Sequence, residues 1–357
     1  MSAFAWSQIE QLVQQGRPVH EKNLTGLVAN ARTLCNAVFS QCDLRGSDWQ
    51  HATLTGVTFI NCNLQGALFH KAMLERATFS DCDLQNAIWH ESTLLQTTFA
   101  QCQLTNSGWH GASIEKSGIF KCALQQSQWN NARLVRVALT ECKLDHSCWR
   151  GLRVEQSVVT DADLRTLDLD GLSAKACVFI DANLANKDLR GLVMQSCTLR
   201  SADFTAANLC GLDFTGTNVS DAVFNQAVLD GIIAPNIMLA GARFSQCSAR
   251  SAQLDGAILR AAQLADTDMS GCKLNGSVWD KAKLERVCLC DAQLDYARMA
   301  HTSGTDVDFR QARLRHANLH GANWVHCDFR YADCTGLRQT NPALAAAEAR
   351  SLSMELS

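Results

Sequence analysis

The chain has 357 residues, of which 47% are hydrophobic and only 3 are proline, so it can bury a sizeable core and is neither linker-rich nor disordered. Lysine and arginine number 32 against 35 aspartate and glutamate residues, which gives a net charge of -3. This balance does not favour a nucleic-acid-binding protein, a membrane-surface protein or a strongly acidic mimic of a nucleic acid.

The N-terminal stretch MSAFAWSQIEQL lacks a basic region followed by a long apolar run, and no window of the chain holds 18 consecutive apolar residues. We therefore expect neither a signal peptide nor a membrane span, and a cytoplasmic protein with reduced thiols. Ser2 is the expected N-cap of a helix over residues 3–15, with Trp6 and Ile9 on its apolar stripe and Gly16 at its end.

A period of five residues governs the next three hundred positions. From Leu34 to Cys334, the positions whose numbers end in 4 or 9 are large apolar residues, and the exceptions are Ala174, Ala234, Ala249, Gly304 and Cys334. A small residue usually stands two positions before these centres, and glycine favours the second position after them, where a turn needs its dihedral freedom. Such a period fits neither a helix nor a long strand, so each unit forms one short side of a four-sided, 20-residue coil.

The five-residue units resemble the A(D/N)LXX motif of the pentapeptide repeat family. The matching segments are CDLRG from Cys42, CNLQG from Cys62, ADLRT from Ala162, ANLAN from Ala182, ADFTA from Ala202 and ANLHG from Ala317. The resemblance implies an all-β fold, a right-handed quadrilateral β-helix of about 15–16 coils at the strand spacing of a parallel sheet. Terminal helices are expected to cap it.

Residues 20 apart are expected to stack in columns. Cysteine forms one inward column, which holds Cys42, Cys62, Cys82, Cys102, Cys122 and Cys142. We interpret these thiols as small buried hydrophobes, and the alternative is a metal or redox ladder. A second column of mostly tryptophan centres pairs with small partners. In a third column, from Leu152 to Ile232, large residues stand where the repeat elsewhere has small ones. This column predicts that the cross-section of the coil changes near residue 150, without a domain boundary.

The domain prediction follows from these patterns. Residues 1–23 form an N-terminal capping helix and entry turn, residues 24–338 form the solenoid, and residues 339–357 form a C-terminal helix. Asn341 is the expected cap of this last helix, with Pro342 as its first residue. The C-terminal helix either covers the last coil or joins two copies of the chain as a homodimer.

The chain shows no signature of catalysis: it has no phosphate-binding glycine loop, no nucleophile elbow and no Cys-x-x-Cys zinc pattern. We therefore predict a non-enzymatic protein without a cofactor. The weak candidate for a metal site is an outward column formed by His70, His90 and His110. That column continues with Asn130 and Arg150, which favours an ordinary solvated ridge.

The predicted partner is another protein, with no nucleic acid and no membrane. On one face, the outward position before each centre carries threonine and aliphatic residues instead of the usual Asp or Asn. The candidate partner-binding residues on this face are Val158, Val178, Met238, Ile258 and Val278. The alternative reading of the stripe is the β-propensity of threonine and valine.

Two function classes remain open. The opening IEQLVQQGRPVHEKNLTGL resembles stand-alone pentapeptide repeat proteins associated with bacterial type VI secretion, which implies a rigid protein-binding scaffold. The alternative is similarity to the quinolone-resistance branch of the family, which implies a DNA mimic that binds a type II topoisomerase. The near-neutral charge and the absence of a register-breaking insertion count against this alternative.

Overall fold

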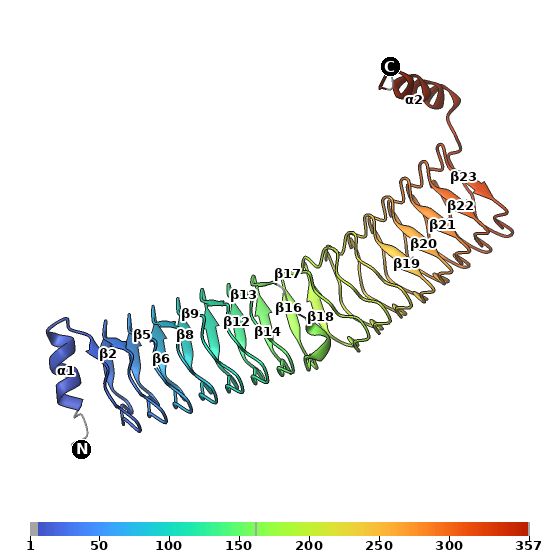
Figure 1. Ribbon diagram of the computed structural model, residues 1–357. Helices are drawn as coiled ribbons and strands as arrows, with labels where there is room; N and C mark the ends of the chain where they lie inside the picture. Colours follow the sequence, from blue (N-terminus) through green and yellow to red (C-terminus); the bar gives the residue numbers. More distant parts are fainter. Residues whose placement is uncertain (1–5, 161–162, 356–357) are drawn as a thin grey trace. The chain divides into compact units, whose positions relative to one another are not determined.

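The computed structural model describes residues 6–160 and 163–355 of an all-β parallel solenoid of about 15 turns, with one short helix at each end. The chain divides into two compact units, Met1–Ala182 and Asn183–Ser357, and within each unit the coils stack on one another (Figure 1). Residues 20 apart pair in parallel, as Phe39 does with Phe59. The predicted fold class is therefore confirmed, while the predicted domain bounds stay a prediction.

In the first unit, two faces of the coil are three-residue strands and the other two are single parallel bridges such as Asp43 to Asn63. One sheet contains β1 (Val19–His20), β3 (Val38–Ser40), β5 (Thr58–Ile60), β7 (Thr78–Ser80), β9 (Thr98–Ala100), β11 (Gly118–Phe120), β13 (Ala138–Thr140), β15 (Val158–Thr160) and β17 (Val178–Ile180). The other contains β2 (Thr33–Cys35), β4 (Thr53–Thr55), β6 (Met73–Glu75), β8 (Thr93–Leu95), β10 (Ser113–Glu115), β12 (Arg133–Val135), β14 (Arg153–Glu155) and β16 (Ser173–Lys175).

In the second unit, single bridges such as Asn218 to Met238 dominate, and the strands lie mainly on one face. These strands are β18 (Val193–Gln195), β19 (Arg243–Ser245), β20 (Gln263–Ala265), β21 (Lys283–Glu285), β22 (Ser303–Thr305) and β23 (Asn323–Val325), of which β19 to β23 form one sheet. A 3-10 turn, η1 (Leu164–Thr166), lies in the first unit and is capped by Asp163, whose side chain accepts a hydrogen bond from the Arg165 N–H.

The inward positions of the five-residue pattern form the core. Every member of the Leu152 to Ile232 column is at most 4% exposed, so its inward assignment is correct. Packing explains why Gly304 is an exception to the pattern of large centres. The Trp324 ring occupies the space that a Cβ at Gly304 would need, so the neighbouring coil supplies the missing volume.

The cysteine column is buried, and all of its thiols are free. Each thiol donates a hydrogen bond to the carbonyl of a centre 23 residues earlier, as Cys42 Sγ does to the Val19 carbonyl at 3.2 Å and Cys82 Sγ to the Phe59 carbonyl at 3.4 Å. Cysteine thus fills a narrow inward position and also satisfies a backbone acceptor, which alanine would not do.

The corners of the coil explain the glycine preference. The second residue after most centres has a positive φ, 62° at Gly46 and 65° at Gly66, and asparagine takes the same conformation at Asn86 with a φ of 58°. Left-handed backbone is accessible to glycine without steric cost and to asparagine at small cost, so these residue types recur at the corners.

The helix α1 (Trp6–Gln14) lies against the first coil through Ile9, which is fully buried. It ends at Gln14, two residues before Gly16, whose φ is 64°, and the expected N-cap Ser2 lies outside the described residues. The helix α2 (Pro342–Glu355) begins where predicted, and Asn341 Oδ1 caps it by accepting hydrogen bonds from the Ala343 and Leu344 N–H groups. Residues 356–357 of its predicted range are also outside the description. Neither described helix is long and apolar enough to cross a membrane.

Candidate protein-binding surfaces

The three-residue strands place their first and third residues outward and their middle residue in the core. In the first unit this geometry exposes an apolar surface on the sheet that contains β11, β15 and β17. We call it the first patch, and it consists of Phe120, Val158, Val178 and Ile180. Val158 is 36%, Phe120 39% and Ile180 45% exposed, and Val158 pairs directly with Val178. The outer face of this sheet therefore presents aliphatic and aromatic groups to solvent.

Phe120 has a position built for it. A Cβ at Gly118 would collide with the Phe120 ring, so the ring lies over the bare backbone of Gly118. Gly118 is consequently buried although it occupies an outward position. An aromatic ring that lies over the backbone of a strand and remains 39% exposed has the character of an anchor residue at a protein interface.

The second unit carries a separate apolar surface, the second patch, formed by Met238, Ile258 and Val278. These residues stack through parallel bridges from Met238 to Ile258 and from Ile258 to Val278. Met238 is 42% exposed, and the same coil exposes Val228 by 37% and Ile233 by 38% on its neighbouring faces. This coil thus replaces the usual polar outward residues with apolar ones on several faces.

The predicted partner-binding residues consequently fall into two groups: Val158 and Val178 lie in the first unit, and Met238, Ile258 and Val278 in the second. The sequence prediction missed the exposed Phe120, Ile180, Val228 and Ile233. It considered only one outward position on one face, and the signal for Phe120 and Ile180 was present in the alternation of inward and outward residues along each strand.

Outside the patches the surface carries paired charges. Aspartates before the centres bind arginines two residues later or in a neighbouring coil, and these pairs include Arg165–Asp163, Arg190–Asp188, Arg330–Asp328 and Arg315–Asp333. The hydrogen bond from Arg165 holds the pKa of Asp163 below its usual value, so the carboxylate stays ionised beside its counterion. Such exposed pairs add little stability, but they cancel the negative field of the aspartates.

The histidine column does not converge on one point. His90 and His110 have ring centroids 6.0 Å apart, and a Cβ at Gly108 would lie 2.6 Å from His90 Nε2, so the His90 ring lies over that glycine. Burial, followed by the charges of His110 and His70, lowers the pKa of His90 and favours its neutral form. Within the described chain these three side chains do not form a group of ligand atoms within 4.8 Å, and a metal site there stays a prediction.

A second histidine cluster fixes α2 to the coils of the second unit. Glu348 lies 3.4 Å from His301 Nε2 and 3.2 Å from His320 Nε2. The Asn341 N–H donates to His320 Nδ1 at 3.1 Å, so Nε2 of the neutral ring carries the proton and donates to Glu348. These contacts therefore serve as an attachment of the helix. The last coil nevertheless leaves Trp324, Phe329 and Leu337 around an open groove of about 500 Å³.

Two family models match the coils of this chain. The family model described as "Pentapeptide repeat region" matches residues 33–109, 52–129 and 262–338, and the one described as "Pentapeptide repeats (8 copies)" matches residues 175–211, 193–231 and 239–276. No curated protein matches the chain. Among solved structures, QnrB1, a plasmid-mediated fluoroquinolone resistance protein, is 16% identical with a TM-score of 0.30, and the match covers 57% of this chain and 93% of that one.

HetL, a protein involved in heterocyst differentiation regulation from the cyanobacterium Nostoc sp. strain PCC 7120, is 21% identical with a TM-score of 0.21. That match covers 76% of this chain and 93% of HetL. The segments matched by the two family models together include more than half of the sequence, and they coincide with the coils of both units. The chain belongs to the pentapeptide repeat family.

Proposed function

We propose that the chain is a non-enzymatic scaffold that binds another protein through the first and second patches. The observation that carries this proposal is the exposure of Phe120, Ile180 and Met238 at outward positions, which the fold does not require to be apolar. Val158 and Val178 of the first patch are stacked neighbours, as are Met238 and Ile258 of the second. Contiguous apolar side chains on a surface indicate contact with another molecule. Stacked strands present them as a flat, rigid surface, which reduces the ordering cost of binding.

The alternative function is a DNA mimic that binds a type II topoisomerase. Duplex DNA carries one negative charge per about 1.7 Å of its axis, so a mimic needs dense carboxylates without counterions. Here the aspartates of the coils are matched by arginines, as in the Arg190–Asp188 pair at 2.7 Å and the Arg313–Asp295 pair at 2.7 Å. This pairing favours the scaffold. Addition of the purified protein to a gyrase supercoiling reaction tests the alternative, which predicts inhibition or protection of the enzyme.

The proposed cellular setting is bacterial type VI secretion. It rests on the resemblance of residues 9–27, which form the end of α1, the turn at Gly16 and Pro18, and the entry into the first coil. The gene neighbourhood tests this setting, because a scaffold of a secretion system is expected to be encoded beside the other components of that system.

The binding experiment uses two patch variants and a matched control. Val158→Lys with Val178→Lys alters the first patch, and Met238→Lys with Ile258→Lys alters the second. Met73→Lys with Thr93→Lys is the control, because these residues also pair across adjacent coils but lie on the other sheet of the first unit. Each variant creates the same pair of stacked charges, so differences in binding report the face that is altered.

We expect a protein captured from the native cell lysate by the wild-type chain and by the control to be lost with at least one patch variant. Circular dichroism and thermal melting should be unchanged in all three. Equal capture of every protein by the wild type and both patch variants would refute the proposal.

A second copy of the chain is the proposed additional partner, with α2 as the contact. Leu344 on this helix is 48% exposed, which leaves an apolar group for such an interface. Light scattering after size-exclusion chromatography is expected to give twice the mass of the chain, and Leu344→Glu to return it to that of one chain.

A further inference from the structure

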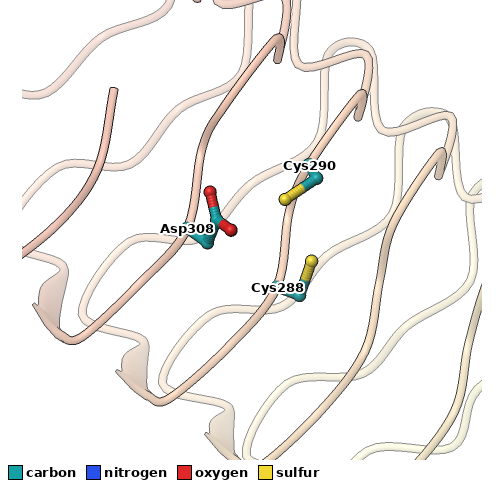
Figure 2. A group of neighbouring side chains, drawn as sticks. All are labelled: Cys288, Cys290 and Asp308. Carbon is teal, nitrogen blue, oxygen red and sulfur yellow. The ribbon is translucent and has the colours of Figure 1, made fainter. Parts of the chain in front are cut away.

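Two cysteines in the second unit flank a buried leucine and lie on the outer surface. Cys288 and Cys290 stand on either side of Leu289, which is fully buried, and both thiols are partly exposed. Asp308 belongs to the next coil and pairs with Cys288 through a parallel bridge. The two Sγ atoms and a carboxylate oxygen of Asp308 all lie within 4.8 Å of one another. Figure 2 shows the three side chains around one shared space.

The spacing of these atoms is close to that of a metal centre. Zinc bound tetrahedrally at about 2.3 Å from each sulfur holds two thiolates roughly 3.8 Å apart. The present separation of at most 4.8 Å is therefore closed by small rotamer adjustments of side chains that are partly solvent-exposed. Thiolate ligands select zinc and other thiophilic ions over magnesium and calcium.

Asp308 is held in the orientation that a ligand needs. Arg310 donates from Nε to Asp308 Oδ1 at 2.9 Å and from a terminal nitrogen to Oδ2 at 2.7 Å. This fork fixes the position of the Asp308 carboxylate. A carboxylate offers about four lone-pair positions, so Asp308 can keep Arg310 and also bind a cation. Ligating carboxylates in proteins are commonly supported by such a hydrogen bond.

We propose that Cys288, Cys290 and Asp308 bind one thiophilic divalent cation such as Zn²⁺, with a fourth coordination position facing solvent. Two thiolates and one carboxylate leave a single negative charge around the ion, and the Arg310 guanidinium balances it. Three protein ligands with one open position distinguish this site from a closed four-ligand structural centre. The Cys-x-Cys spacing of Cys288 and Cys290 differs from the Cys-x-x-Cys zinc pattern, so this site was not predicted from the sequence.

The first unit contains a natural comparison. Cys148 stacks below Asp168 with Sγ 3.6 Å from Oδ2, as Cys288 stacks below Asp308. Arg150 occupies the position that corresponds to Cys290 and binds Asp168 at 3.1 Å. This place has the same type of parallel bridge but a single thiol, so it lacks the ligand set of the proposed site.

The test is a titration of the reduced full-length chain with Co²⁺ under anaerobic conditions. The wild type is expected to bind one Co²⁺ with thiolate-to-cobalt charge-transfer absorption in the near ultraviolet, and Zn²⁺ should displace it. Cys148→Ser is the matched control and should leave the titration unchanged. The double variant Cys288→Ser with Cys290→Ser should abolish the absorption band. Arg310→Gln should weaken Co²⁺ binding about tenfold and retain the band.

The three ligands lie on the outer surface, so circular dichroism of the variants should match the wild type, and a lost band then reports lost ligands. Absence of the band in the reduced wild type would overturn the proposal, as would its persistence in the double cysteine variant. A Cys288–Cys290 disulfide that forms in air and no cobalt binding to the reduced chain would assign the pair to redox chemistry and also overturn it.

Discussion

The tryptophan column contains one hydrogen-bond donor that the sequence leaves without a partner. In this column Trp49, Trp109 and Trp129 each donate from Nε1 to the serine two residues earlier, and Trp279 on another face of the second unit does the same, over 2.7–2.8 Å. Trp89 is fully buried, but residue 87 is alanine, and Trp89 Nε1 has no acceptor among the described residues. We predict that Ala87→Ser stabilises the first unit.

The magnitude follows from the cost of an unsatisfied buried donor, about 1–3 kcal/mol. The introduced hydroxyl is expected to take the position of Ser107 Oγ, which accepts from Trp109 Nε1 at 2.8 Å and donates to the Leu104 carbonyl at 2.6 Å. Because the new bond removes an unsatisfied donor but also buries a polar hydroxyl, we expect a net gain of about 1 kcal/mol. The reverse change, Ser107→Ala, leaves Trp109 Nε1 unsatisfied and should cost about 1–3 kcal/mol.

Trp149, in the same column, shows how the stabilisation expected from Ala87→Ser could be prevented. Trp149 Nε1 is unsatisfied although Ser147 is present, and there the Ser147 hydroxyl oxygen accepts from Ser127 Oγ at 3.3 Å. At residue 87 the neighbours in the column are Ala67, which has no hydroxyl, and Ser107, whose hydroxyl already donates to a carbonyl. Neither of these neighbours is therefore expected to donate a hydrogen bond to the introduced hydroxyl oxygen, which stays available to Trp89 Nε1.

The assay is urea unfolding followed by tryptophan fluorescence, with both variants and the wild type measured together. Because each coil of a solenoid contacts only its neighbours, the two units can unfold in separate transitions. The quantity compared is therefore the urea concentration at the midpoint of the transition in which the first unit unfolds. Ala87→Ser should raise this midpoint and Ser107→Ala should lower it. A lowered midpoint for Ala87→Ser, or an unchanged one for Ser107→Ala, would refute the role assigned to the indole hydrogen bond.

Three further outcomes are expected. Burial raises the pKa of Cys142 to about 12. In native protein at neutral pH, a maleimide should therefore label the exposed Cys35 and leave Cys142 unlabelled until denaturant is added. Rapid labelling of Cys142 in the native protein would contradict its burial. Leu192→Asp places a carboxylate at a position 4% exposed and should lower the melting temperature by the equivalent of several kcal/mol, whereas unchanged melting would contradict the inward column. Glu348→Ala removes the acceptor of His320 and should increase hydrogen exchange at residues 342–348, and unchanged exchange would show that other contacts hold α2.

The sequence predicted the coils well because a solenoid repeats one local geometry. Each coil contacts only its neighbours, so the period of five residues directly gives the inward positions, the corners and the pairing of residues 20 apart. The exchange of large and small residues beside Leu152 and Leu172 could be predicted for the same reason, since both lie in one column. The start of α2 was predictable from local capping residues, Asn341 and Pro342.

The outward side chains were less predictable, because the repeat does not constrain them. The sequence by itself determined which residues face the core, since burial imposes a fixed choice of size at every inward position. Only the tertiary structure decided that Phe120 lies over Gly118 and that Cys288, Cys290 and Asp308 share one space. These outcomes depend on the rotamers of partly exposed side chains and on contacts between successive coils, and several rotamers are compatible with the same repeat.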